Sequence, residues 1–498
     1  MKQSRNITAA VIEHGVSVLS LFIVYRIIIK QLGVESLGLW SILLSIFSLT
    51  NIGNAGFASS TLKFVAKYKA YDDHRKIVRL IETSLIIVLL TTLVMFLIVL
   101  VIITLLHKNI FTTQEITIIV TLLPWIVPSL FVAIVGRVYL SALDGLNLIH
   151  YRSYIGIASK LVFICSSIYG IHYYEINGLA FANFLQYLVI LVGAIILLKK
   201  KYPNMRIFFF RFDRILFFEV FKYGYHFQVG SIFQMLIDPI AKFFLKDFGG
   251  LASVGTFEVI YKFFLQVRQL IVVVVSVFVP SIANLKEVAP EKIKELFKNM
   301  FGVTCIVSAF LFAFTFVLLP YLLSTVSIDM DNTILLYSVY IYWGLLANLI
   351  GVPPYMFNLG TGNIKSNTLT SSIMAATCGC FTYILGKLWQ GDGVVIGWAF
   401  SQILANLILV ILFFRKEKLE FTTLLQKDSF ILIILNLLFV AICSIVIVKV
   451  KYNIFISLYA GLSIYTIYVL SNYYLINKVN VLFRQLITKV SLLKVSKL

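Results

Sequence analysis

The segment Gly33-Val34-Glu35-Ser36-Leu37-Gly38 recurs as Gly250-Leu251-Ala252-Ser253-Val254-Gly255, and the two copies are 217 residues apart. A second glycine pair, Gly145 and Gly362, has the same spacing. Each of these segments interrupts long apolar runs. A shared offset of this kind aligns two successive sets of helices, so the sequence predicts an internal repeat that decides the architecture of the chain.

The composition around these segments is that of a membrane protein. Of the 498 residues, 60% are hydrophobic and 13% are charged, whereas an ordinary soluble domain is roughly half apolar and a quarter charged. The net charge of +20 falls on a chain too apolar to be a nucleic-acid binder, so it belongs at the edges of membrane spans. We therefore exclude a soluble core and expect no nucleic-acid partner.

Apolar runs between polar or glycine breaks predict about fourteen transmembrane helices. They lie near residues 7–31, 38–62, 82–106, 116–142, 152–174, 177–198, 217–245, 251–282, 299–323, 333–358, 367–389, 393–414, 429–450 and 453–477. The repeat aligns the first six helices with the next six, and because six is even, both copies enter the membrane from the same side.

The predicted fold class is therefore an all-α polytopic membrane protein with two parallel six-helix bundles around a central cavity. We expect an N-terminal six-helix lobe at residues 1–200, a C-terminal six-helix lobe at 217–415, and two additional helices with a basic tail at 428–498. The connectors on one side of the membrane carry 29 Lys and Arg residues against five on the other. The positive-inside rule then places the basic side, with both termini, in the cytoplasm.

Polar residues inside the spans are concentrated near 251–282. On an ideal helix Lys262 and Gln269 fall within about 60° of Glu258. Arg268 lies about 80° to one side of this stripe, has no acidic residue three or four positions away, and costs roughly 2.5–3.5 kcal/mol on insertion scales. Arg268 is therefore expected to pair with another helix or to bind a ligand.

A second polar stripe, Gln234, Asp238 and Lys242, lies in the span near 217–245. The pairs Asp238–Lys242 and Glu258–Lys262 are both spaced i,i+4, so one interpretation is that they only neutralise each other within their helices. The other is that these residues gate transport or couple it to an ion. The sequence leaves both open.

Basic residues outnumber acidic ones within the predicted spans by eight to about five, which favours an anionic substrate. At an effective dielectric constant of about 20, a cation 4 Å from a phosphate contributes roughly 4 kcal/mol of attraction before desolvation.

The chain has no Gly-x-x-x-x-Gly-Lys-Ser/Thr, His-Glu-x-x-His or Gly-x-Ser-x-Gly motif. We expect no cofactor, no metal and no catalytic residue, and transport driven by an ion gradient, the membrane potential or the substrate gradient.

The N-terminal region carries a family resemblance. Arg26, the run Gln31–Trp40, the run Asn51–Ser60 and the basic stretch Lys63–Lys69 resemble the Wzx-type polysaccharide-biosynthesis flippases of the multidrug/oligosaccharidyl-lipid/polysaccharide (MOP) exporter superfamily. The resemblance implies a flippase that moves an undecaprenyl-pyrophosphate-linked oligosaccharide, such as an O-antigen (lipopolysaccharide) or capsule repeat unit, to the outer leaflet of the bacterial cytoplasmic (inner) membrane. Expected partners are this lipid-linked glycan, membrane lipid, and a polymerase or other glycan-assembly membrane proteins.

Because the resemblance implies a transporter, we expect the polar residues within the spans to form the transport site. The residues expected to line the substrate cavity are Arg26, Asn51, Asn54, Gln234, Lys262, Arg268 and Gln269. The residues expected to act in coupling or gating are Asp238, Lys242, Glu258 and Glu13.

Three alternatives to a flippase are retained. A multidrug cation antiporter of the same superfamily would have the same fold, but its cavity should be net acidic. A major-facilitator transporter would carry a Gly-x-x-x-Asp-Arg type signature, which the 63–79 loop lacks. An integral polysaccharide polymerase or glycosyltransferase would need a sizeable external loop, and every predicted external connector is short.

Overall fold

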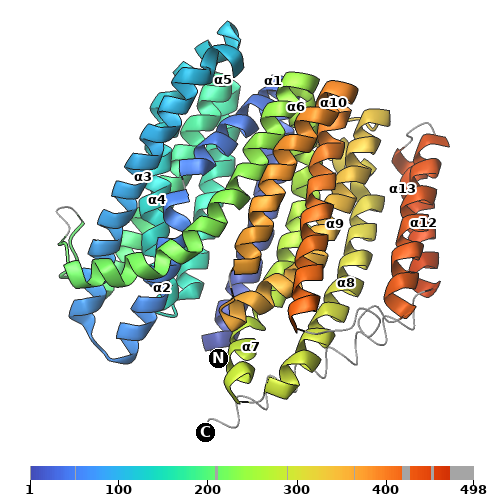
Figure 1. Ribbon diagram of the computed structural model, residues 1–498. Coiled ribbons are helices and arrows are strands. Elements are labelled where there is room, and N and C mark those ends of the chain that lie inside the picture. Colours follow the sequence, from blue (N-terminus) through green and yellow to red (C-terminus); the bar gives the residue numbers. More distant parts are fainter. Residues whose placement is uncertain are drawn as a thin grey trace. The chain divides into compact units, whose positions relative to one another are not determined.

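The computed structural model describes residues 2–50, 52–110, 112–207, 211–288, 290–363, 365–417, 427–449 and 454–471. These residues form twelve helices and no strand (Figure 1). The helices are α1 (Lys2–Thr50), α2 (Ile52–Ala70), α3 (His74–Ile110), α4 (Thr113–Gly145), α5 (Ile149–Lys201), α6 (Arg214–Ser276), α7 (Val279–Val288), α8 (Pro290–Thr325), α9 (Asn332–Thr361), α10 (Lys365–Glu417), α12 (Lys427–Lys449) and α13 (Ile454–Ser471). Within the described residues, eight helices are long and apolar enough to cross a membrane, so the chain is a multi-pass, all-α membrane protein.

Four of these helices contain one sharp bend each, which relates them to the fourteen predicted spans. The bends lie at Gly33 in α1, Glu175 in α5, Gly250 in α6 and Gln390 in α10. In α5 the chain reverses at its bend: a Cβ on Gly170 would lie 2.7 Å from the carbonyl oxygen of Gly178, although residues eight apart in a straight helix are about 12 Å apart. Each bend therefore lies between two predicted spans, although the span predicted near 38–62 is divided between α1 and α2.

The bends come in matched pairs, which supports the repeat. Gly33 has φ 84° and ψ 167°, and Gly250 has φ 79° and ψ 172°. Glu175 has φ 51° and ψ −134°, and Gln390 has φ 53° and ψ −137°. Left-handed φ values favour glycine, so only the first pair was visible in the sequence.

One predicted glycine match needs correction. A Cβ on Gly145 would lie 2.7 Å from the carbonyl oxygen of Leu62, and a Cβ on Gly360 would lie 3.0 Å from that of Val279. Both glycines thus allow a close approach to equivalent positions on a neighbouring helix. The counterpart of Gly145 is therefore Gly360, whereas Gly362 caps the end of α9 in the left-handed conformation.

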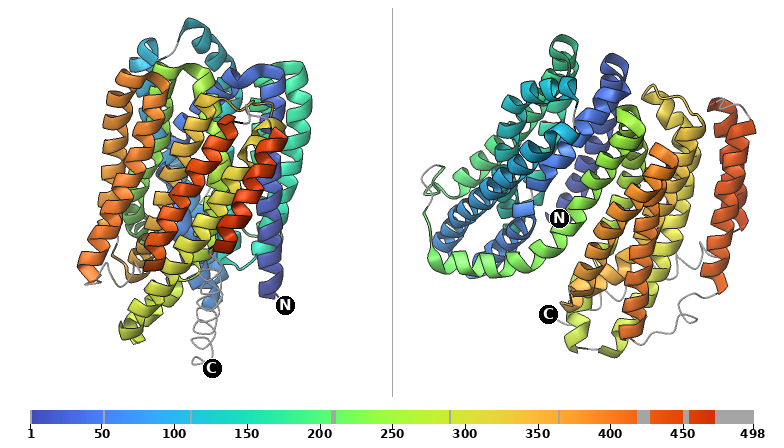
Figure 2. Two further views of the ribbon diagram at one scale, coloured as in Figure 1. Left: turned by 90° about the vertical axis from the view of Figure 1, so that its right-hand side faces the viewer. Right: turned by 45° about the horizontal axis from the view of Figure 1, so that its top comes forward.

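The chain divides into two compact units, residues 1–239 and 240–498. The division falls inside α6 beside Pro239, a residue that interrupts helical hydrogen bonding. Lobes at 1–200 and 217–415 with two additional helices at 428–498 stay a prediction. The additional helices α12 and α13 pack beside each other and against α8 (Figure 2).

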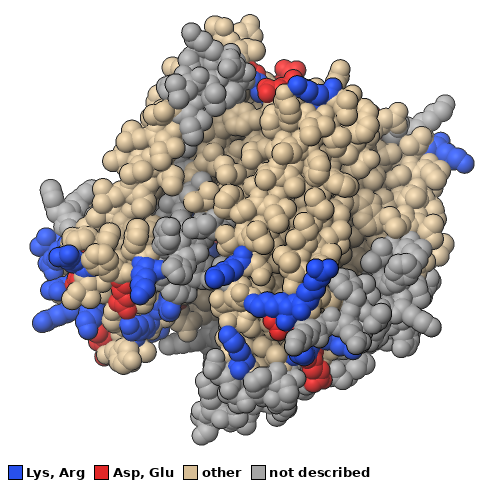
Figure 3. Space-filling view, in the orientation of Figure 1, with Lys and Arg blue, Asp and Glu red and all other residues tan. Residues whose placement is uncertain are grey.

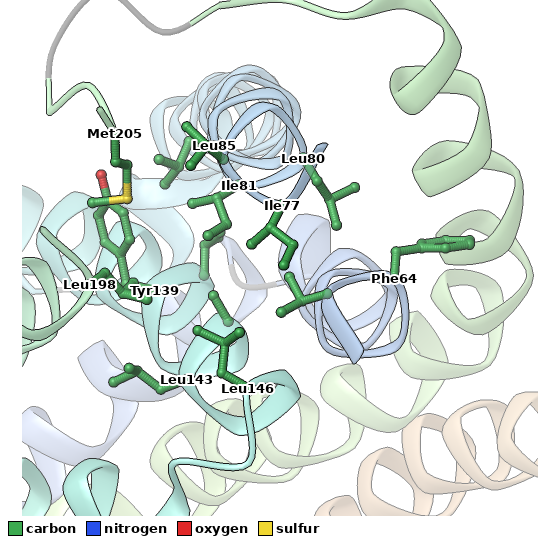
Figure 4. Close-up of a cluster of buried hydrophobic side chains, with 14 of the residues drawn as sticks. Phe64, Ile77, Leu80, Ile81, Leu85, Tyr139, Leu143, Leu146, Leu198 and Met205 are labelled. Carbon is green, nitrogen blue, oxygen red and sulfur yellow. The ribbon is translucent and has the colours of Figure 1, made fainter. Parts of the chain in front are cut away.

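The core of unit 1 is an apolar cluster shared by α2, α3, α4, α5 and the start of α6 (Figure 4). Residues spaced i,i+4 supply its stripes, among them Ile77 and Ile81 in α3, which are both fully buried. The buried carboxylate of Glu82 accepts backbone N–H bonds from Arg206 and Arg211 at 2.9 and 3.0 Å. These bonds hold Arg206 and Arg211, which precede α6, against α3.

Basic side chains gather at one end of unit 1. On the face that Figure 3 shows, Lys and Arg lie around α2 and the beginning of α6, while the band above them is almost free of charge. This separation is typical of a membrane protein with charged connectors on one side of the bilayer.

Candidate functional site

The two arms of α6, before and after Gly250, bring three charged side chains together in unit 2. Lys242 Nζ lies 2.8 Å from Glu258 Oε2, and Lys262 Nζ lies 3.4 Å from Glu258 Oε1. Lys242 and Glu258 are each 2% exposed, and charges buried this deeply are tolerated only when they are paired. This charge cluster, Lys242, Glu258 and Lys262, has two cations and one anion, so it carries a net charge of +1.

The structure shows the predicted pair of Glu258 with Lys262 and adds a pair that the i,i+4 spacing did not predict. Glu258 does pair with Lys262 on its own helical arm, but it also pairs with Lys242 on the other arm. The side chain of Lys262 is 27% exposed, whereas that of Lys242 is 3% exposed. Because Lys262 is both more exposed and farther from the carboxylate, it is the member of the cluster that a ligand can reach.

Arg268 lies further along α6, is half-buried and is held by amides rather than by an acid. Its Nε donates to Asn348 Oδ1 of α9 at 2.8 Å. Asn348 Nδ2 in turn donates to Gln402 Oε1 of α10 at 3.2 Å. Among the described residues, no carboxylate lies within ion-pair distance of Arg268, so its positive charge is not neutralised. Gln269, the next residue, is exposed.

Asp238 lies in the first arm of α6, within unit 1. Its Oδ2 accepts a hydrogen bond of 2.6 Å from Ser45 Oγ of α1, and Ser45 is 3% exposed. Gln234, about one turn earlier, is exposed. The bond from Ser45 orients the Asp238 carboxylate, which directly precedes Pro239 in the chain.

The remaining predicted residues lie on α1 and α2. Glu13 is half-buried, and its side chain packs against Gly156 of α5, where a Cβ would displace the Glu13 carboxylate. Arg26 is exposed, and no carboxylate among the described residues pairs with it. Asn51 lies outside the described residues, as does the side chain of Asn54 in α2.

Some of the predicted site residues are therefore in contact, whereas others belong to a different compact unit. It brings Lys242, Glu258 and Lys262 into contact, and it links Arg268 to two further helices. Glu13, Arg26, Gln234 and Asp238 belong to unit 1. In the part of the chain that the structure describes, His, Cys, Asp and Glu side chains form no group of three or more that could hold a metal ion.

Sequence reasoning missed the amide partners of Arg268. Asn348 and Gln402 lie in apolar helices, and Gln402 is 5% exposed. Polar amides within membrane helices commonly hydrogen-bond across helices, so their presence in the spans near 333–358 and 393–414 was a usable signal. Ser45, the partner of Asp238, carries no such signal because serine is common in membrane helices.

A family comparison assigns the chain. The model for the family described as polysaccharide biosynthesis protein matches residues 4–286. The chain belongs to this polysaccharide biosynthesis protein family. The match includes α1 to α6, and so both the bend-related charge cluster and Arg268. A search of curated proteins finds no match.

Solved structures show that this family member has the MOP transporter fold. An inward-facing multidrug resistance MATE family transporter of the MOP superfamily superimposes with a TM-score of 0.70 at 14% identity, over 79% of this chain and 93% of that one. The lipid II flippase MurJ, in an inward closed conformation, gives 0.64 at 14% identity over 95% and 99%. A MOP superfamily transporter from Pyrococcus furiosus gives 0.60 at 13% identity over 83% and 95%.

Proposed function

We propose that this polysaccharide biosynthesis family member is a flippase for a polyprenyl-pyrophosphate-linked oligosaccharide, an O-antigen or capsule repeat unit, and works by alternating access. The observation that carries the proposal is Arg268, a cation in an apolar helix with no acidic partner among the described residues. Such a placement is costly unless the residue has a function. A pyrophosphate supplies the missing negative charge.

The charge cluster supplies a second cation. A phosphate that approaches Lys262 competes with Glu258 at 3.4 Å, while Lys242, 2.8 Å from Glu258, still supplies a positive charge beside the carboxylate. Glu258 and Lys242 thus act as a gate that releases Lys262 to the substrate. Arg26 and the polar residues Asn51, Asn54, Gln234 and Gln269 complete the proposed lining, and Glu13 and Asp238 are the proposed coupling residues.

The charge of the proposed site distinguishes a flippase for an anionic substrate from a cation exporter. A multidrug cation antiporter needs uncompensated acids, whereas the carboxylate of Glu258 is shared by two lysines. The Pyrococcus furiosus relative is described as having a binding pocket of reverse polarity that suggests a different function. We apply the same criterion to this chain.

The proposal also places the protein in the bacterial cytoplasmic membrane with both termini in the cytoplasm, beside a polymerase and other glycan-assembly proteins.

Reconstitution tests the proposal against the enzyme alternative. The purified protein is placed in sealed vesicles that hold an undecaprenyl-pyrophosphate-linked oligosaccharide, and glycan exposed to an added glycosidase is followed over time. A flippase makes the inner-leaflet glycan accessible and forms no new product in detergent. A new glycan product in detergent, or no gain in accessibility, would contradict the proposal.

A further inference from the structure

We propose that Asn348 and Gln402 are positioning residues that hold the Arg268 guanidinium so that its Nη groups face a diphosphate. This inference deepens the proposed function and rests on it. Its basis is the three-helix chain of hydrogen bonds from Arg268 in α6 to Asn348 in α9 and Gln402 in α10.

The first step concerns the edges of the guanidinium. Arginine presents five N–H donors in a rigid, planar fork, which can bind two acceptor oxygens through its Nε edge or through its Nη edge. Asn348 Oδ1 occupies Nε at 2.8 Å. No described residue accepts a hydrogen bond from the Nη groups of Arg268. The edge left for a two-oxygen ligand is therefore the Nη edge.

The second step concerns the orientation of Asn348. An amide that turned its NH2 group toward a guanidinium would oppose two donors, so Asn348 must present its oxygen. Gln402 Oε1 fixes this orientation because it accepts a hydrogen bond of 3.2 Å from Asn348 Nδ2. The backbone carbonyl oxygen of Gln402 accepts a bond of 2.8 Å from Asn406 Nδ2, and Gln402 and Asn406 are 5% and 6% exposed.

The third step concerns charge. A carboxylate at position 348 would orient Arg268 equally well, but it would also neutralise it. A neutral amide fixes the geometry and leaves the full positive charge for the ligand. Two parallel N–H···O bonds to phosphate oxygens are strong and directional, so a rigid Arg268 favours a phosphorylated lipid over an uncharged one.

Binding of short prenyl phosphates to the full-length protein in detergent tests the inference. Dissociation constants are measured for farnesyl diphosphate, farnesyl monophosphate and farnesol. We expect Asn348→Ala to weaken binding of farnesyl diphosphate and farnesyl monophosphate about 10-fold or more and to reduce the preference for farnesyl diphosphate over farnesol. In the Arg268→Ala background, Asn348→Ala should change the affinity less than about 2-fold, because positioning requires the positioned group.

A matched control and a second variant keep the result interpretable. Asn358, a buried amide of α9 whose Nδ2 donates to Asn367 Oδ1 at 2.8 Å, should alter thermal stability when changed to Ala but leave the diphosphate preference unchanged. If Asn348→Ala does not fold, Asn348→Asp replaces it; it keeps the acceptor and neutralises Arg268, so it should also weaken diphosphate binding.

The outcomes separate the two proposals. If the unaltered protein bound farnesyl diphosphate no better than farnesol, the proposed function would be overturned. If it bound the diphosphate through Arg268, but Asn348→Ala had no effect or had the same effect with and without Arg268, only the positioning role would be overturned. If Asn348→Asp bound the diphosphate as tightly as the unaltered protein, that role would also fail.

Discussion

Lys242 and Glu258 form a buried ion pair across the bend at Gly250, with 2.8 Å between Lys242 Nζ and Glu258 Oε2. The two residues come from arms of α6 that are separate spans in the sequence. Because Glu258 also meets Lys262, its single carboxylate compensates two cations. The three possible single substitutions in the cluster therefore have different consequences.

Glu258→Gln should be the most damaging of these changes. It removes the carboxylate that pairs with two lysines, one of them fully buried, and breaking a buried pair in this way costs about 3–5 kcal/mol. Thermal unfolding in detergent measures the loss. Asp73→Asn, which removes the charge that pairs with the exposed Lys76 but keeps an acceptor for its backbone N–H, is the control and should change stability little. Equal stability of Glu258→Gln and the unaltered protein would show that the cluster is not a structural unit.

Lys262→Met should separate stability from transport. It leaves the Lys242–Glu258 pair intact as a neutral, buried unit, so the unfolding temperature should change little. Flipping in sealed vesicles should fall strongly, because the accessible cation is lost. Lys242→Met is the comparison variant, since it leaves Lys262 in place. Normal flipping by Lys262→Met would rule out substrate contact at this position.

The bends at Glu175 and Gln390 should be strained. Both residues have a positive φ, a conformation that costs a residue other than glycine about 1–3 kcal/mol. Glu175→Gly and Gln390→Gly should each raise stability by up to about 1 kcal/mol after the entropy cost of glycine. Gly178→Ala should lower it, because Gly170 occupies the space that its Cβ needs. Lower thermal stability of both glycine variants would contradict this account of the bends.

The contact between α2 and the beginning of α6 should loosen at acidic pH. Partial burial acts to raise the pKa of Glu219, but hydrogen bonds from Lys67 and Tyr68, both 2.7 Å long, outweigh it and lower the pKa below its ordinary value. A carboxyl with a lowered folded-state pKa stabilises the fold above its unfolded pKa of about 4.3, and this stabilisation is lost as the pH falls through the folded pKa. The difference in unfolding temperature between the unaltered protein and Glu219→Gln should therefore be constant near neutral pH and shrink below about pH 4.3. A difference that grew on acidification would contradict the assignment.

Hydrophobic patterning predicted most of the helices because each membrane span is a long apolar run that ends at polar or glycine residues. The expected break between residues 174 and 177 lies at Glu175, and the break between 389 and 393 lies at Gln390. The span near 251–282 was placed less well, since α6 ends at Ser276 and α7 begins at Val279. The residues at this junction are as apolar as those of the helix, so composition gives no signal for it.

The candidate site was predictable in its residues but not in its contacts. Spacing along one helix suggested a pair of Lys242 with Asp238, but it gave no sign of the pair of Lys242 with Glu258, which forms because the bend at Gly250 returns the chain. The bond from Arg268 to Asn348 joins residues 80 positions apart. Such contacts depend on how helices are rotated against each other, which the apolar pattern of a membrane helix does not determine.

The central claim is that the uncompensated cation at Arg268 binds the anionic group of a lipid-linked glycan. The most direct test is export of the surface glycan in cells that carry Arg268→Ala as their only copy, at a protein level equal to that of the unaltered chain. Lys387→Ala, which removes a cation lying over the ring of Tyr383, is the matched control. We predict that Arg268→Ala abolishes export, that Arg268→Lys impairs it because lysine offers only a point charge, and that Lys387→Ala exports normally. Normal export by Arg268→Ala would contradict the account.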